Sequence, residues 1–153
     1  MNWAFLFGFT NVVALAGWLM LAVLPRGPRA MALILYACVA ILCLVYAVLF
    51  VLLFAKLVDP GTVEGAGGQG SFSSIAGIRG LFASDGGIVI GWTHYLAFDL
   101  FVGLWIAKDA DHKGFSRLFQ LPFLLATLTA GPIGLLLWLI TREARARRAA
   151  LKT

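Results

Sequence analysis

Charged residues are scarce in this chain, and their scarcity excludes a water-soluble fold. Only 12% of the 153 residues are charged, and 61% are hydrophobic. A soluble domain is typically about a quarter charged and about half apolar. So few charges cannot cover a water-facing surface. The composition therefore predicts an integral, multi-pass protein of the cell membrane that forms a single transmembrane domain over residues 1–153.

Histidine, cysteine and phosphate-binding motifs are also sparse, which argues against several kinds of site. Of the two histidines, His94 is the one within a hydrophobic run, so a haem held by two histidines inside a bundle is not expected. Cys38 and Cys43 lack zinc-type and redox spacing. The loop glycines do not form the GxxxxGK phosphate motif. We therefore expect no cofactor and no metal site.

Long hydrophobic runs, in contrast, fill most of the chain. A helix needs about 20 residues to cross a hydrocarbon core of about 30 Å, and four runs are long enough: about 3–24, 30–55, 88–107 and 119–141. The first lacks the basic start and cleavage site of a signal peptide, so we expect it to be retained. The sequence predicts an all-α membrane protein with four transmembrane helices in a small antiparallel bundle.

The connection at residues 59–87 has two parts with different patterns. The first part is rich in glycine and is predicted to be a loop. In the second part Phe72, Ile75, Ile78 and Phe82 recur at roughly helical spacing, which predicts a short amphipathic segment on the membrane surface or capping the bundle. An irregular loop is the alternative.

The positive charge is concentrated in the C-terminal tail, residues 142–153, with the sequence REARARRAALKT. A basic tail directly after a span is typical of contact with anionic lipid headgroups, and no nucleic-acid partner is expected. With four spans, lysine and arginine divide almost evenly between the two sides of the membrane. The positive-inside rule then favours two cytoplasmic termini only slightly.

Two polar residues interrupt the third run, GWTHYLAFDLFVGLWIAKDA. An aspartate at the bilayer centre costs about 2.5–3.5 kcal/mol, so Asp99 is predicted to face protein. At helical periodicity Trp92, Tyr95 and Gly103 share its side, and Gly103 leaves space there for a ligand or a neighbouring helix. His94 points about 140° away. We take His94 and Asp99 as candidate catalytic residues of an acid–base site that opens to an apolar interior.

Residues from the other spans add candidate partners at similar depth. If the first and third spans are parallel, Asn11 lies level with His94. Pro132, near the middle of the fourth run, would free the carbonyl of Leu128 to accept a hydrogen bond from Asp99. Simple interhelical contact for Asn11 and a packing kink for Pro132 are the alternatives. The candidate ligand-binding residues are thus Asn11, Trp92, Tyr95, Phe98, Gly103, Trp105, Leu128 and Pro132.

The segments GSFSSIAGIRGLFAS, GWTHYLAFDLFVGLWIAKDA and LPFLLATLTAGPIGLLLWL resemble the neoxanthin-synthase-like family, named after the plant abscisic-acid-deficient-four protein. The start of the chain, NVVALAGWLMLAVLP, also resembles that family's first span, and the short chain with a basic tail resembles its bacterial members. The plant members are implicated in converting violaxanthin to neoxanthin, the opening of an epoxide to an allene without net redox change. The resemblance implies a carotenoid-like or other isoprenoid ligand and an isomerase that uses an acid and a base.

Two other functions stay open at this stage. The chain could be a non-enzymatic scaffold or a subunit of a larger complex, whose polar residues only fix helix packing. It could also be a proton-linked carrier that uses Asp99 and works as a homo-oligomer.

Overall fold

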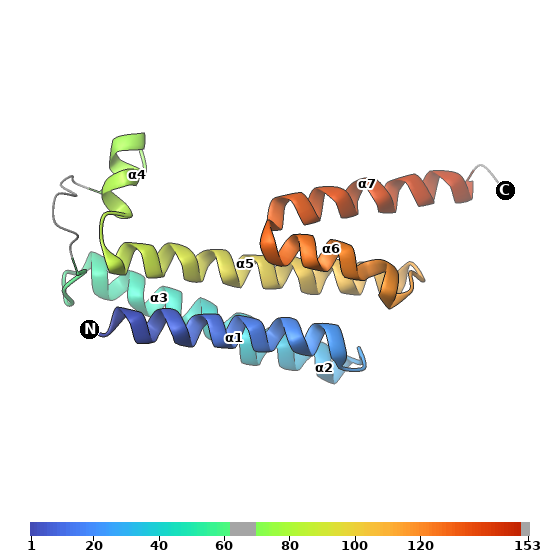
Figure 1. Cartoon of the computed structure of the whole chain (residues 1–153), viewed down its shortest axis with the longest axis horizontal. Coiled ribbons are helices and arrows are strands. Elements are labelled where there is room, and N and C mark those ends of the chain that lie inside the picture. Colours follow the sequence, from blue (N-terminus) through green and yellow to red (C-terminus); the bar gives the residue numbers. More distant parts are fainter. Residues whose placement is uncertain (62–69, 151–153) are drawn as a thin grey trace.

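The computed structural model describes residues 1–61 and 70–150, with side chains up to Glu143. Within these residues the chain is helical (Figure 1), which confirms the predicted all-α class. The elements are α1 (Trp3–Val23), α2 (Pro28–Ile34), the π-helical turn η1 (Leu35–Val39), α3 (Ala40–Phe54), α4 (Ile75–Leu81), α5 (Asp85–His112), α6 (Arg117–Thr129) and α7 (Gly131–Ala150).

Three stretches are long and apolar enough to cross a membrane: Trp3–Val23, Pro28–Phe54 and Asp85–His112. They correspond to the first three predicted spans. The second is one continuous helix in which α2 passes through η1 into α3. In Figure 1, α1 and α5 run in the same direction and α3 runs against them. Ser84 caps the start of α5 by accepting a hydrogen bond from the Gly87 amide at 3.1 Å.

The prediction of a fourth span over 119–141 is not supported, because the helix breaks in its middle. Ala130 has non-helical backbone angles, φ −154° and ψ 75°, and ends α6. Pro132 is the second residue of α7, a position that suits proline because the first helical amides need no acceptor within the helix. The 13 residues of α6 rise about 20 Å, less than the hydrocarbon core of about 30 Å.

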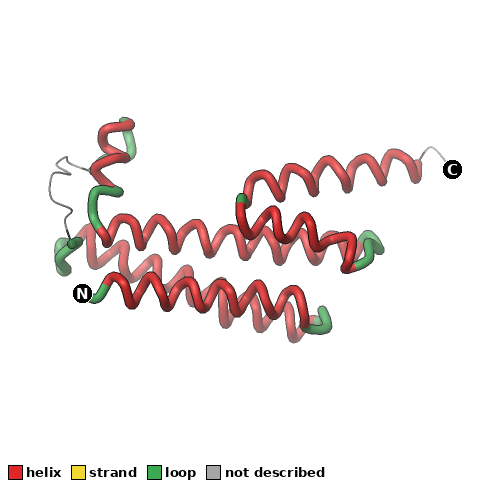
Figure 2. The backbone as a smooth tube through the Cα atoms, viewed as in Figure 1, coloured by secondary structure: helices red, strands yellow, loops and turns green. Residues whose placement is uncertain are grey.

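The two halves of that run instead form a hairpin. In Figures 1 and 2, α6 runs from the end of α5 toward the middle of the bundle, and α7 returns to the same end. The helices cross closely at Gly134, where an added Cβ would lie 2.4 Å from the Thr127 amide nitrogen. The hairpin is tied to α5 by buried Trp138, whose indole donates to Asp109 Oδ2 at 3.0 Å.

Glycines also set the contact between α1 and α5. An added Cβ at Gly103 would lie 2.3 Å from the ring of Trp18, and one at Gly17 would lie 2.5 Å from Leu100. Such close approach through small residues is how transmembrane helices associate, because lipid supplies no hydrophobic drive between them. The core around Trp18 and Leu100 therefore depends on α1 lying directly against α5.

The predicted amphipathic segment between the second and third spans is the helix α4. Ser74 caps it by accepting from the Gly77 amide at 3.0 Å. Phe72 and Ile75 are exposed, 70% and 81% respectively, whereas the ring of Phe82 packs against Gly91 of α5. The segment is thus a short helix that stands out to the side of the start of α5 in Figure 1. Part of the predicted glycine-rich loop, 62–69, lies outside the described residues.

The two ends of the bundle differ in which parts of the chain they gather. The N-terminus and α4 lie at one end, whereas the α1–α2 turn, the end of α5 and the C-terminal part of α7 lie at the other (Figure 1). The start of the chain and the end of α7 therefore lie at opposite ends of the bundle. The pair of cytoplasmic termini stays a prediction.

Candidate functional site

Asp99 lies at the middle of α5, where the tip of the α6–α7 hairpin meets it. Asp99 is 8% exposed. A Cβ added at Gly131 would lie 1.9 Å from Asp99 Oδ1. The Tyr95 hydroxyl and the Gly131 amide are the polar groups next to the carboxyl. Its Oδ2 is buried without a hydrogen-bond partner among the described residues. The carboxyl therefore faces protein, packed against backbone that only a glycine leaves open.

Tyr95, one turn before Asp99, connects α5 to the end of α6. Its hydroxyl donates to the Thr129 carbonyl at 3.1 Å, which satisfies one of the acceptors left free where α6 ends. The structure thus brings the hairpin tip, rather than the Leu128 carbonyl, to this part of α5. The prediction that Pro132 lies in the middle of a span and frees the Leu128 carbonyl is wrong. Pro132 instead lies at the start of the helix α7. Leu128 is partly buried against the core.

Asn11 and Trp92 continue this polar row onto α1. The Trp92 indole donates to Asn11 Oδ1 at 3.2 Å, and its ring lies 5.2 Å from that of Tyr95. Asn11 in turn donates to the Phe7 carbonyl at 2.7 Å. Asn11 therefore links α1 to α5 through Trp92, and no contact between Asn11 and His94 is found within the described part of the chain.

His94 lies on a different face of α5, as helical periodicity predicts. Its ring stacks on Phe98 with centroids 4.6 Å apart, and the ring of Tyr46 from α3 lies 5.5 Å away. The side chain is exposed at the outer surface of the bundle. The two candidate catalytic residues thus do not share one site, because Asp99 meets the hairpin and His94 meets α3.

A long apolar groove runs along the α3 and α5 surface that holds His94; we call it the α3–α5 groove. The name covers two separate cavities of about 480 and 260 Å³, and His94 lines the smaller one. From Tyr36 to Phe54 the helix rises about 27 Å. The cavities are lined by Leu35, Tyr36, Val39, Ala40, Cys43, Ala97, Phe98 and Phe101, and by Tyr46, Phe50, Leu53, Phe54, Phe72, Leu81, Phe82, Gly87, Ile90, Gly91 and His94.

The remaining predicted site residues lie elsewhere. The space beside Gly103 is filled by Trp18, so a neighbouring helix occupies it. The guanidinium of Arg142 lies 5.4 Å from the ring centroid of Trp105, which is a cation–π contact at the end of the hairpin. Among the described residues, no group of three or more His, Cys, Asp and Glu side chains is placed to hold a metal ion.

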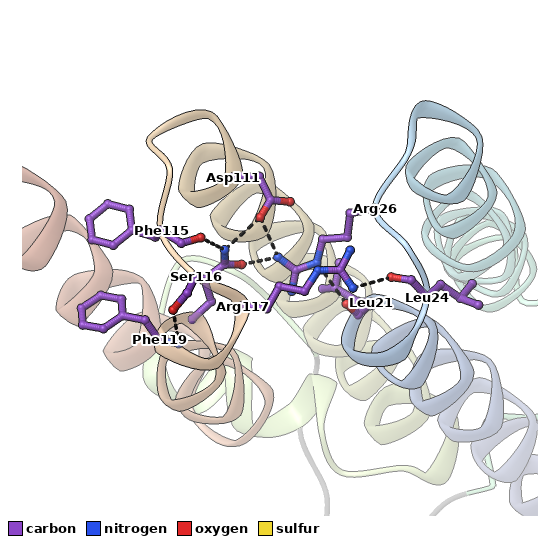
Figure 3. Close-up of polar contacts among 9 residues, drawn as sticks. Leu21, Leu24, Arg26, Asp111, Phe115, Ser116, Arg117 and Phe119 are labelled. Carbon is purple, nitrogen blue, oxygen red and sulfur yellow. Dashed lines mark hydrogen bonds and ion pairs between the residues drawn. The ribbon is translucent and has the colours of Figure 1, made fainter.

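A polar cluster that the sequence did not reveal lies where the α1–α2 turn meets the start of α6 (Figure 3). Arg26 contacts both Asp111 and the amide oxygen of Gln120. Gln120 is fully buried and donates to Asp111 at 2.9 Å and to the Phe115 carbonyl at 3.0 Å. Burial lowers the pKa of the Arg26 guanidinium, and the Asp111 carboxylate opposes this shift. In the sequence, the one sign of this cluster is Gln120, a polar residue at the start of a hydrophobic run.

Comparison with known proteins supplies the family. A search of curated proteins and a search of solved structures give no match. The family model described as ABA DEFICIENT 4-like matches residues 5–138, from the first turn of α1 to Trp138 in α7. That range contains the α3–α5 groove, Asp99 and the hairpin tip, and the resemblance noted in the sequence is confirmed. The chain belongs to the ABA DEFICIENT 4-like family.

Proposed function

We propose that this membrane protein binds a carotenoid-like or other isoprenoid lipid in the α3–α5 groove. The observation that carries the proposal is a pair of apolar, aromatic-lined cavities, whose lining residues on the second span are spread over about 27 Å of helix, with the His94 imidazole in the lining of one of them. Such a shape suits a long, rigid apolar chain that enters sideways from the bilayer. Pockets for apolar ligands are typically lined in this way, with few polar groups to orient the ligand.

The π-helical turn η1 supports the same location. Leu35, Tyr36 and Val39 belong to this turn and line the groove. A π-helical turn is less favourable than continuous α-helix, and such turns frequently occur at functional sites. Here the turn widens the helix where the groove is largest.

In the catalytic form of the proposal, His94 is the residue that touches the ligand. For an epoxide-bearing polyene, the imidazolium donates a proton to the epoxide oxygen as the C–O bond breaks. The neutral imidazole then accepts the proton released from the neighbouring vinylic carbon, so the product is an isomer and no electrons are exchanged. Asp99 is then a positioning residue, since it holds the hairpin against α5 and faces away from the groove.

The groove is tested by filling it. Ala40, which is exposed and lines the groove, is replaced by tryptophan, and the control places the same residue at exposed Ala22 of α1. The protein is purified from membranes of a carotenoid-producing host, and the bound lipids are extracted and identified by mass spectrometry. We expect an isoprenoid with wild type and Ala22→Trp, and much less with Ala40→Trp. Absence of any isoprenoid from wild type, or equal amounts in all three, contradicts the proposal.

Catalysis is tested separately from binding. His94→Gln keeps a polar side chain of similar reach but cannot transfer a proton near neutral pH. In proteoliposomes that contain an epoxy-carotenoid, we expect wild type to form the allenic isomer and His94→Gln to form none while it still binds the pigment. Binding without turnover by wild type would leave a lipid-binding protein and rule out the isomerase.

A scaffold role is the second candidate, and the packing of Asp99 favours it. The carboxyl meets backbone and a tyrosine rather than a cavity, which is what a residue that fixes helix packing would do. In this case Asp99→Asn preserves the function of the complex, whereas Asp99→Leu reduces its assembly. Co-purification of partner proteins with each variant distinguishes the two roles.

We further propose that the end of the bundle holding the α6–α7 hairpin faces the cytoplasm. With three crossings, Arg26, Arg29, Lys108, Lys113, Arg117 and the arginines of α7 fall at one end, against Lys56 and Arg79 at the other. The positive-inside rule assigns the end rich in lysine and arginine to the cytoplasm. The hairpin then enters and leaves the bilayer from the cytoplasmic side.

A further inference from the structure

A second, polar pocket adjoins the α3–α5 groove at its basic end. It measures about 590 Å³ and lies between the α1–α2 turn, the start of the second span and the last turns of α5. It is lined by Arg26, Gly27, Pro28, Met31, Ala32, Leu35, Tyr36, Leu104, Lys108, Asp111 and His112. Leu35 and Tyr36 line the groove as well, so the two cavities meet at these residues.

Arg26 gives the pocket a fixed cation with unused donors. Its side chain is 4% exposed. Nε donates to the Leu21 carbonyl at 3.3 Å, and Nη1 donates to Asp111 and Gln120. No hydrogen bond from Nη2 is found in the described part of the chain, although a guanidinium carries five N–H donors. The guanidinium is therefore held rigidly by protein on one side with donors left for a ligand.

The charge around the pocket is positive. Lys108 makes no ion pair among the described residues, and the imidazole of His112 lies on the same wall. Asp111 is the one carboxylate in the lining, and it is engaged by Arg26 and Gln120. Two cations against one carboxylate leave a surplus that attracts an anion. Beyond them Met31, Leu35, Tyr36 and Leu104 supply apolar surface.

A lipid with an anionic headgroup matches this combination. Arginine binds phosphate through charge-assisted hydrogen bonds, and basic pockets between helices at the cytoplasmic side are typical sites for lipid headgroups. We propose that this pocket holds the phosphate of an anionic membrane phospholipid, with an acyl chain lying over Leu35 and Tyr36 toward the groove. The phosphate lies at Nη2 of Arg26 and the ammonium of Lys108. This site is separate from the proposed isoprenoid function and does not depend on it.

Lys108 carries the test, because Arg26→Gln would also break the cluster with Asp111 and Gln120. Detergent-purified protein is titrated with phosphatidylglycerol and with phosphatidylcholine of the same acyl chains, and binding is measured by native mass spectrometry. We expect wild type to prefer phosphatidylglycerol. Lys108→Gln should weaken phosphatidylglycerol binding about five-fold, the effect of about 1 kcal/mol per basic residue, and leave phosphatidylcholine unchanged.

Lys56→Gln is the matched control, since Lys56 lies at the opposite end of the bundle and has the same charge. It should bind phosphatidylglycerol as wild type does. Equal affinity of wild type for both lipids, or an equal loss in the two lysine variants, overturns the proposal. Displacement of the lipid by an equal concentration of inorganic phosphate also overturns it, because the pocket would then be a site for free phosphate. The isoprenoid experiment tests a different cavity with a different ligand. The isoprenoid proposal and the phospholipid proposal can therefore fail independently.

Discussion

Asp99 illustrates how a single residue can set the geometry of a membrane protein. A carboxyl at mid-bilayer is costly, and here it is buried against the Gly131 backbone with the Tyr95 hydroxyl beside it. Both partners also belong to the contact between α5 and the hairpin. The polar group and the helix break thus depend on each other.

The first prediction concerns the carboxyl itself. Asp99→Leu replaces the carboxyl with a branched side chain at a place where the Gly131 backbone already packs closely. We expect it to lower the free energy of unfolding by about 1–3 kcal/mol, the usual penalty for overpacking. Asp99→Asn keeps an acceptor and should change it less. Denaturation in mild detergent measures both, and a leucine variant as stable as wild type would contradict this account.

The second prediction concerns the glycine opposite it. In Gly131→Ala the new methyl group would lie 1.9 Å from Asp99 Oδ1, so the hairpin tip must move. Overpacking of this kind costs about 1–3 kcal/mol. Gly8→Ala is the matched control, because an added Cβ there meets nothing within 4 Å and alanine favours helix. Thermal unfolding should separate the two variants, and equal melting temperatures would argue against close packing at Gly131.

At the scale of the element, the α6–α7 hairpin is the feature that hydropathy did not predict. The run 119–141 is as apolar as a true span, and hydropathy depends on composition alone. The break needs Ala130 to leave the helical conformation, which becomes favourable when Gly131 packs on Asp99 and Gly134 packs on Thr127. Those contacts join residues of different helices, so the Gly-Pro pair in the sequence was compatible with either a kink or a turn.

The third prediction distinguishes the hairpin from a straight span. The rings of Phe123 and Trp138 lie 5.5 Å apart, whereas in one continuous helix the two residues would be about 22 Å apart. With Cys38 and Cys43 replaced by alanine, the pair Phe123→Cys and Trp138→Cys should react with a short dithiol crosslinker. Digestion and mass spectrometry detect the link.

The control pair combines Phe123→Cys with Leu137→Cys, because Leu137 is exposed and lies about 100° around α7 from Trp138. It should crosslink much less. If neither pair crosslinks while both proteins unfold cooperatively, α6 and α7 do not form this hairpin.

At the scale of the whole molecule, the number of crossings decides the orientation. Four crossings divide the basic residues almost evenly, whereas three crossings collect most of them at the hairpin end. The break at Ala130 places the basic end of α7 beside the end of α5, and the proposed orientation depends on this placement.

The fourth prediction follows from that orientation. In a background without Cys38 and Cys43, Ser73→Cys near α4 and Arg29→Cys at the start of the second span both give exposed thiols. A membrane-impermeant maleimide should label Ser73→Cys in intact cells and Arg29→Cys after the membrane is opened. The reverse pattern would place the hairpin end outside, and labelling of both in intact cells would contradict a three-crossing bundle.

The sequence by itself determined the membrane class, the first three spans and the different faces of His94 and Asp99. These follow from local properties, since lipid selects continuous apolar runs and a helix repeats every 3.6 residues. The tertiary structure decided the hairpin, the partners of Asp99, the groove at His94 and the Arg26 pocket. Each of these depends on which side chains from distant segments meet, and composition and periodicity carry no information about such contacts.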